Sequence, residues 1–293
     1  MAGRFQRVVL GPLRRGGADP AYRVGADGAV WRASRTPEGP GTLRVAGDSA
    51  RAWGPGAQWL LDRLPDLLGE RDEPDGFVAH HRVVAQAQHR NPGLRLCRTG
   101  LVLESLIPSV LEQKVTTVEA YRSWRHLLRK FGEPAPVPDV AGAPSDLYVM
   151  PDARAWTRIP SWEWHLANVD AKRSDTVVRA ARVAARLEEA AGMPYEKAKA
   201  RLELVPGIGP WTSAETLQRS NGAPDALTLG DLHLPGIVGH ALAGKRDATD
   251  ADMLELLAPY AGQRHRAVRL IMLTGLTPPC RAPRMAPGRF SHL

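Results

Sequence analysis

The stretch VPGIGPWTSAETL, residues 205 to 217, places two glycines and two prolines in a short turn and a tryptophan directly after it. The segment YEKAKARLELV leads into this turn with the apolar spacing of a helix, and TSAETLQRS leaves it with the same spacing. Proline suits the first position of a helix, because the amide that it lacks would have no partner there. We therefore predict two helices joined by a Pro-Gly-x-Gly hairpin, the second beginning at Pro210 or Trp211.

The predicted hairpin has the features of an anion-binding turn. Gly207 and Gly209 permit backbone geometry that a Cβ would hinder, and they let the turn approach another molecule without intervening side chains. The amides of Gly209, Trp211 and Thr212 would point out of a helix N-terminus, where the helix dipole favours an anion. A nucleic-acid phosphate is the natural candidate, and a turn that only connects two helices is the alternative. Apolar residues on both sides of the turn favour the DNA-binding hairpin.

An acidic residue follows the hairpin. Asp231 stands in the apolar segment LTLGDLHLP, residues 227 to 235. A carboxylate among apolar residues is costly to bury unless it caps a helix, pairs with another group or takes part in chemistry. Taken alone, Asp231 is best explained as the cap of a helix that starts near Leu234. Its place downstream of a DNA-binding hairpin favours a catalytic role instead.

The composition is that of a soluble globular protein with a basic balance. The chain has 293 residues, 43% of them hydrophobic, which suffices for two domains or for one domain with an appended subdomain. Its 39 Lys and Arg against 31 Asp and Glu give a formal charge of +8, which favours a polyanionic partner. Cys97 and Cys280 lack neighbours at ligand spacing, so we expect neither a zinc site nor a cysteine-bound iron–sulfur cluster.

Because the sequence shows neither a membrane-spanning run nor a signal peptide, we expect a cytoplasmic protein. No apolar run approaches the ~20 residues needed to cross a bilayer. The N-terminal segment has too short an apolar stretch for a signal peptide.

Alternating runs in RFQRVVL, AYRVGADGAVWRAS and TLRVAG predict a small antiparallel sheet near the N-terminus, and the pattern after it is almost wholly helical.

Because the hairpin is followed by an aspartate in an apolar segment, the sequence resembles the helix-hairpin-helix DNA glycosylases. VPGIGPWTSAETL with LTLGDLHLP looks most like the bacterial 3-methyladenine DNA glycosylase II branch, and NPGLRLCRTGLVLESLIPSVLEQKVTT looks like that family's entry into its helical domain. The resemblance implies a mainly α fold with a small N-terminal antiparallel α/β domain. We expect this mixed α/β domain over residues 1–95, two packed helical subdomains with the active-site cleft between them over 96–277, and a basic extended tail over 278–293.

The resemblance also implies roles for individual residues. Asp231 would be the catalytic aspartate, whose carboxylate stabilises the positive charge that builds on the sugar as the N-glycosidic bond breaks, or helps to position the attacking water. Gly207, Gly209 and Thr212 would lie at a DNA phosphate. A structural monovalent cation between protein and phosphate would be held by the backbone carbonyls of Glu203, Val205 and Ile208.

Trp211 bears on the mechanism. In relatives that also cut the DNA strand, the matching position is a lysine whose amine forms a Schiff base with the sugar. Tryptophan there implies a monofunctional enzyme that uses water, without a cofactor. Its indole would face the flipped base, where an electron-rich ring favours a cationic alkylated purine, and the alternative is a core tryptophan. Trp164 and Tyr121 are further candidates for the base pocket, among aromatic residues that mostly belong to the core.

Three more residues receive provisional roles. Gln113 and Lys114 lie where the family places the residues that enter the duplex and fill the gap left by the extruded nucleotide. An apolar wedge is common in this branch, so contact with a phosphate or with the orphan base is the alternative for Lys114. His233 would orient Asp231, contact DNA or serve as a structural histidine. The last helix, RLIMLTG, lacks the second aromatic residue that the family often supplies, which leaves the breadth of base recognition open.

The sequence therefore predicts a monomeric, monofunctional DNA glycosylase that flips an alkylated purine out of damaged duplex DNA and hydrolyses its N-glycosidic bond in base-excision repair. Two alternatives remain open. One is a glycosylase of the same fold for an oxidised base or a bulky adduct. The other is a DNA-binding protein without catalysis, in which Asp231 only caps a helix.

Overall fold

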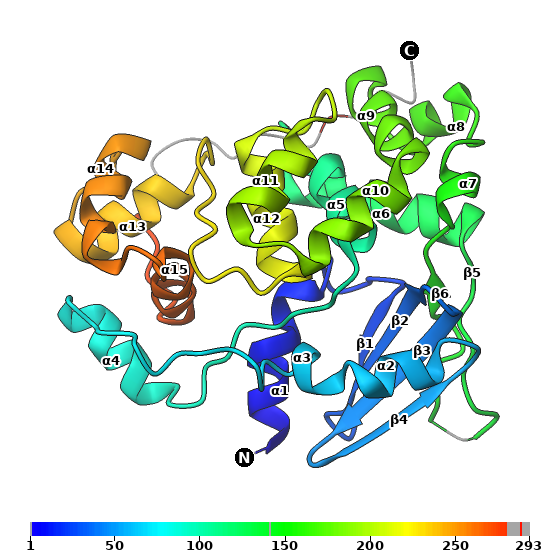
Figure 1. The fold of residues 1–293 in the computed structure, drawn as a ribbon, viewed down its shortest axis with the longest axis horizontal. Coiled ribbons are helices and arrows are strands. Elements are labelled where there is room, and N and C mark those ends of the chain that lie inside the picture. Colours follow the sequence, from blue (N-terminus) through cyan, green and yellow to red (C-terminus); the bar gives the residue numbers. More distant parts are fainter. Residues whose placement is uncertain (1, 141, 280–287, 289–293) are drawn as a thin grey trace.

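The computed structural model describes residues 2–140, 142–279 and 288, and Figure 1 shows their arrangement. The fold is mainly α-helical with a small antiparallel sheet near the N-terminus, as predicted. The basic tail predicted over 278–293 lies almost wholly outside the described residues. Among the described residues, no helix combines the length and the apolar character that a bilayer span requires.

The sheet has four strands in the order β1-β2-β3-β4, and each is antiparallel to its neighbours. Alternating side chains of β2 and β3 give it a buried face, which packs against two short helices that follow the sheet. The elements are β1 (Tyr22–Val24), β2 (Val30–Thr36), β3 (Gly39–Ala46), β4 (Ser49–Trp53), α2 (Ala57–Asp62) and α3 (Leu64–Leu67).

The strand predicted from RFQRVVL is wrong. These residues belong to α1 (Ala2–Leu10), which the short turn η1 (Gly11–Leu13) follows. The buried side chains of α1 are Gln6, Val9 and Leu10, a spacing of three and four residues that defines one helical face. Val9 and Leu10 join the core beneath the sheet, so burial on a helical face outweighs the β propensity of the two valines.

The remaining elements are almost all helices. Their bounds are α4 (Arg82–Arg90), α5 (Val102–Leu111), α6 (Thr117–Phe131), β5 (Glu133–Pro134), β6 (Tyr148–Val149), α7 (Ala153–Trp156), α8 (Ser161–Leu166), α9 (Ala171–Arg182), α10 (Ala184–Glu188), η2 (Glu189–Gly192), α11 (Tyr195–Glu203), α12 (Pro210–Ser220), α13 (Leu234–Ala243), α14 (Asp250–Leu256), η3 (Ala258–Tyr260) and α15 (Arg264–Leu273).

The helices form two units with separate hydrophobic cores. The larger core contains residues from the run of helices that begins with α5 and ends with α12, and these two helices pack against each other within it. The smaller core joins α13, α14 and α15 with α4. In Figure 1 the smaller unit lies at the left and the larger unit at the upper right, above the sheet.

Helix α4 departs from the predicted domain plan. Val84 and Ala87 of α4 share a core with Val238, Met253 and Ile271 from the C-terminal helices. The chain therefore leaves the sheet after α3 and joins the smaller helical unit before it enters α5. Residues 1–95 do not pack as one N-terminal unit.

Candidate active site

The hairpin lies between the end of α11 at Glu203 and the start of α12 at Pro210. Gly207 has a φ of +99°, and a Cβ there would lie 2.9 Å from Cγ2 of Thr176 on α9 and closer still to its Oγ1. The fold thus requires glycine at 207. Gly209 has a φ of −109°, which any residue adopts, and a Cβ there would meet no atom within 4 Å. Packing within the chain therefore does not explain glycine at 209, which leaves bare backbone at the N-terminus of α12.

Side chains hold the two helices of the hairpin together. Ser213 Oγ donates to Glu203 Oε1 at 2.7 Å, and Arg179 of α9 donates to the carbonyl of Pro206 at 3.3 Å. The amide of Ile208 donates to the carbonyl of Val205 at 3.0 Å, which leaves that carbonyl one lone pair for a cation. The cation site assigned to the carbonyls of Glu203, Val205 and Ile208 stays a prediction.

The turn between α5 and α6 is fastened to the hairpin. Gln113 Nε2 donates to the carbonyl of Gly207 at 3.0 Å and to Oγ1 of Thr212 at 2.7 Å. The next residue, Lys114, is exposed and has a φ of 55°, the left-handed backbone of a tight turn. Thr212 is buried, and its hydroxyl is engaged by Gln113, so the phosphate contact expected of this residue stays a prediction.

Asp231 lies in the loop between α12 and α13, and three hydrogen bonds fix its carboxylate. Oδ1 accepts the amides of His233 and Leu234, both at 2.8 Å, at the start of α13. Oδ2 accepts the indole N–H of Trp211 at 3.0 Å. The helix cap predicted as an alternative is therefore present, and the hairpin tryptophan orients the same carboxylate.

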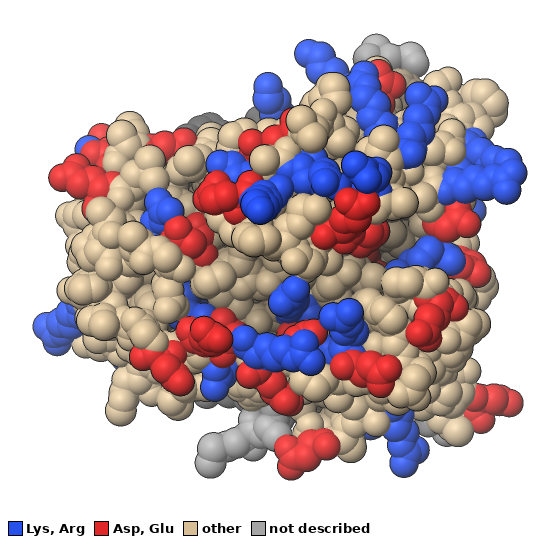
Figure 2. All heavy atoms as spheres, viewed as in Figure 1, with Lys and Arg blue, Asp and Glu red and all other residues tan. Residues whose placement is uncertain are grey.

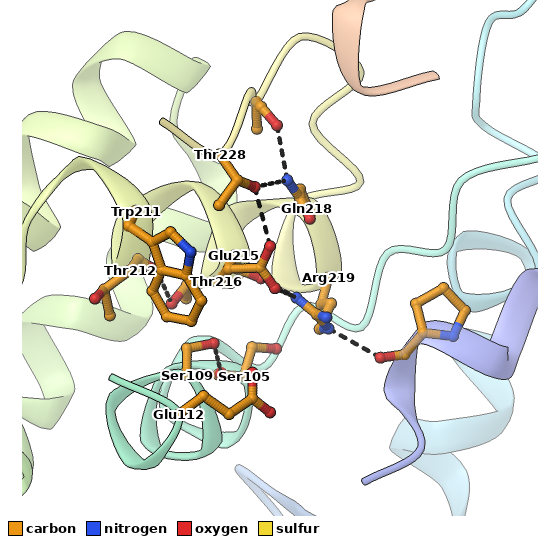
Figure 3. Close-up of polar contacts among 12 residues, drawn as sticks. Ser105, Ser109, Glu112, Trp211, Thr212, Glu215, Thr216, Gln218, Arg219 and Thr228 are labelled. Carbon is orange, nitrogen blue, oxygen red and sulfur yellow. Dashed lines mark hydrogen bonds and ion pairs between the residues drawn. The ribbon is translucent and has the colours of Figure 1, made fainter. Parts of the chain in front are cut away.

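Helix α12 also anchors the loop that carries Asp231. Gln218 Nε2 donates to the carbonyl of Ala226 and to Oγ1 of Thr228, both at 2.8 Å. Thr228 Oγ1 in turn donates to Oε1 of Glu215 at 2.9 Å, as Figure 3 shows. The start of this loop is thereby held on the helix that begins at the hairpin.

A cavity of about 390 Å³ opens beside Asp231 between α12 of the larger helical unit and α13 and α15 of the smaller one. Its volume falls in the range of about 300–1,000 Å³ that is typical of small-molecule sites. The polar side chains among its walls include Glu215, Arg219, Asp231, His233, His265 and Arg269.

The charges in the Asp231 cavity are partly matched. Arg219 Nη1 contacts Glu215 Oε2 at 2.7 Å. Burial works against the charge on Arg219, but the carboxylates of Glu215 and Glu112 outweigh it and raise the pKa of this guanidinium. Burial first, and then the charges of Arg269 and Arg219, lower the pKa of His265 well below its usual value, so its ring is neutral at pH 7.

Known proteins resemble this chain in sequence and in structure. No protein-family model matches it. A probable bifunctional transcriptional activator/DNA repair enzyme AlkA of Mycobacterium tuberculosis is 32% identical over 237 residues, which are 74% of this chain and 45% of that protein. A DNA-3-methyladenine glycosylase of Bacillus subtilis is 24% identical over 217 residues, 70% of each chain. The structure of a 3-methyladenine DNA-glycosylase from Archaeoglobus fulgidus superimposes with a TM-score of 0.72 at 16% identity, over 91% of this chain and 94% of the other.

In sequence the chain is thus similar to a protein named as a DNA repair enzyme AlkA and to a 3-methyladenine DNA glycosylase. It spans less than half the length of its mycobacterial relative. The likeness to the archaeal structure shows a shared fold, that of the helix-hairpin-helix DNA glycosylases.

Two aromatic residues expected in a base pocket lie elsewhere. Trp164 is 3% exposed, stacks on Trp156 and donates its indole N–H to the carbonyl of Ile159. It is a core residue of the larger helical unit, because its ring is buried against Trp156 of α7. Tyr121 packs against the chain at Gly16, where a Cβ would lie 2.7 Å from its ring. Neither side chain lines the Asp231 cavity, and Trp211 is joined to it only through the hydrogen bond to Asp231.

The sequence prediction missed the polar wall of this cavity. Glu215 and Arg219 follow Trp211 by four and eight residues, so the helical period places all three on one face of α12. That spacing was available in the sequence. His265 and Arg269 carry no such signal, because they reach the cavity only through the packing of α15 opposite α12.

Proposed function

We propose that this chain is a monofunctional DNA glycosylase that excises alkylated purines from duplex DNA by base flipping and hydrolysis of the N-glycosidic bond. The observation that carries the proposal is the placement of Asp231, which the hairpin tryptophan and the amides of α13 hold at the edge of a cavity between the two helical units. The names of the relatives in sequence support the same reaction.

Duplex DNA would bind across the hairpin and the turn that carries Lys114. The open backbone at Gly209 and the first amides of α12 would contact a phosphate. Helix α9, which packs on the hairpin, carries the exposed cations Lys172, Arg179 and Arg182. Figure 2 shows Lys and Arg gathered over this end of the molecule, which supports a contact with the DNA backbone.

The damaged base would turn out of the stack into the Asp231 cavity, with the ring of Trp211 beside it. The carboxylate of Asp231 would stabilise the positive charge that develops on the sugar as the bond to the base breaks. Its hydrogen bonds to Trp211, His233 and Leu234 hold it in place before the reaction begins, so little reorganisation is needed. Lys114 would enter the gap in the duplex or contact the orphan base.

The residues at the site support hydrolysis by water rather than attack by an amine. Trp211 occupies the position where strand-cutting relatives have lysine, and no lysine lines the cavity among the described residues. The protein would work as a cytoplasmic monomer and without an organic cofactor.

Release of free base from alkylated DNA tests the proposed function. The purified chain, incubated with a methylated duplex, is expected to release methylated purines, and the DNA strand is expected to stay intact until it is treated with alkali. Borohydride added during the reaction should trap no covalent protein–DNA adduct. A protein that binds the duplex but releases no base from methylated DNA would be the non-catalytic alternative, and a trapped adduct would show a lyase.

A further inference from the structure

The wall of the Asp231 cavity formed by α12 is polar rather than aromatic. Glu215 and Arg219 lie one and two turns after Trp211, so the three residues share a face of the helix. Both line the cavity, and their side chains are 16% and 14% exposed. Long charged side chains held at this depth require partners, because their desolvation is costly.

The partners of Glu215 fix its carboxylate from two sides. Oε2 accepts Nη1 of Arg219 at 2.7 Å, and Oε1 accepts the hydroxyl of Thr228 at 2.9 Å. The same hydroxyl accepts a hydrogen bond from Nε2 of Gln218 at 2.8 Å, so its own proton is directed toward Glu215. Figure 3 shows this chain of contacts running from α12 to the loop that leads to Asp231.

The partners of Arg219 fix its guanidinium in the same way. Nε donates to the carbonyl of Pro12 at 2.9 Å, and Nη1 donates to both the backbone carbonyl and the carboxylate of Glu215. The ion pair is therefore tied to α12 at one end and to the N-terminal segment at the other. Such a pair has few rotamers left, which is what a recognition element requires.

Hydrogen-bonding capacity is left over on both members of the pair. Each carboxylate oxygen of Glu215 accepts one bond among the described residues and has a further lone pair. Nη2 of Arg219 makes no hydrogen bond to the described residues. An acceptor and a donor thus stand next to each other on a wall of the cavity.

We propose that Glu215 and Arg219 read the Watson–Crick edge of the flipped purine by hydrogen bonds. The inference rests on the proposed function and names the substrate class of that site. An adenine methylated at N3 or N7 keeps its amino donor beside the N1 acceptor, and an N7-methylguanine keeps its two donors beside O6. An adenine whose N1 and N6 are bridged by an etheno group has no donor on this edge. It would leave the carboxylate of Glu215 buried without a partner from the base, which disfavours binding.

The rest of the cavity supports hydrogen-bond recognition over attraction by charge alone. Its two carboxylates, Glu215 and Asp231, are outnumbered by three arginines, Arg95, Arg219 and Arg269, and His265 is neutral. The cavity is therefore not an anionic cage that would take any cationic base. It distinguishes bases by the groups on their edge.

The test compares two bases in the same duplex sequence, N7-methylguanine and the etheno-bridged adenine, by their kcat/KM for base release. The wild-type chain is expected to favour N7-methylguanine by about ten- to hundredfold. Glu215→Leu should lower this ratio by about tenfold or more relative to the wild-type chain, and Glu215→Gln, which keeps one acceptor, should lower it less. Asp225→Asn is the matched control, because Asp225 pairs with Arg264 outside the cavity at a similar depth.

The ratio separates recognition from a merely structural role, because a general loss of folded protein lowers both rates alike. A wild-type chain that releases both bases equally would overturn the proposal, as would a ratio that Glu215→Leu leaves unchanged. If Glu215→Leu does not fold, the same change of ratio relative to the wild-type chain is measured with Glu215→Gln. A wild-type chain that releases neither base would instead remove the proposed function.

Discussion

The two glycines of the hairpin are predicted to have separable roles, and alanine at each position tests this. At Gly207 the φ of +99° places a Cβ in the left-handed region and against Thr176. The backbone costs about 1–2 kcal/mol there, and overpacking adds about 1–3 kcal/mol. We therefore expect Gly207→Ala to lower the free energy of unfolding by about 2–5 kcal/mol.

At Gly209 the same substitution meets neither penalty. A Cβ there has no neighbour within 4 Å, and the φ of −109° suits alanine. Alanine reduces the entropy of the unfolded chain by about 0.4–1 kcal/mol, while replacing glycine by alanine, a poorer N-cap residue, costs roughly 0.5–1 kcal/mol, so stability should change little. A methyl group at the phosphate site, however, should weaken duplex binding by about tenfold or more through loss of charge-assisted hydrogen bonds.

Urea unfolding followed by circular dichroism measures the first quantity, and fluorescence anisotropy with a labelled duplex at fixed salt measures the second. The double variant Gly207→Ala/Thr176→Ala should recover the overpacking part of the loss but not the backbone part. Gly209→Ala that binds the duplex as tightly as wild type would refute the assignment of the open backbone to a phosphate. Equal stability of Gly207→Ala and wild type would refute the packing argument.

Three further predictions concern the surroundings of the site. Gln113→Ala removes the hydrogen bonds to Gly207 and Thr212, so it should lower the free energy of unfolding in urea by about 1–3 kcal/mol and weaken duplex binding. An unchanged midpoint of urea unfolding would count against the link between the turn and the hairpin. Duplex affinity should fall steeply as the salt concentration rises. If Lys114 contacts a phosphate, Lys114→Ala should reduce the slope of the logarithm of the binding constant against the logarithm of the salt concentration by about 1. An unchanged slope would exclude that contact. The pKa of His265 is lower in the folded chain than in the unfolded chain, so the unfolded chain binds more protons below about pH 6.5. The free energy of unfolding should therefore fall by up to about 1.4 kcal/mol for each unit by which the pH is lowered below this value. His265→Gln should flatten this dependence, and identical pH profiles of the two proteins would show that His265 is not responsible.

The parts of the fold and site that the sequence predicted are those with local signals. Proline at the first position of α12 and the Gly-x-Gly turn before it mark the hairpin from residues that are adjacent in the chain. Asp231 stood out because a carboxylate in an apolar segment requires an explanation. The structure adds that Asp231 accepts hydrogen bonds from both α13 and Trp211, so the capping bond by itself does not decide between a capping and a catalytic role.

The parts that could not be predicted depend on long-range packing. A short apolar run such as that of α1 is compatible with a strand or a helix, and only its burial under the sheet selects the helix. Likewise, α4 joins helices that follow it by more than a hundred residues. The roles of Trp164 and His265 were hidden for the same reason, because the packing of neighbouring helices places one in a core and the other at a cavity.

Asp231→Asn tests the central claim most directly, by single-turnover release of methylated purine from a saturated duplex complex. Asparagine keeps the size of the side chain and an oxygen for the amides of α13, but it removes the charge that would face the sugar. We expect a rate at least about 100-fold below wild type, with duplex affinity and the control variant Asp225→Asn close to wild type. A rate equal to that of wild type would show that Asp231 only caps α13, and the proposed mechanism would be wrong.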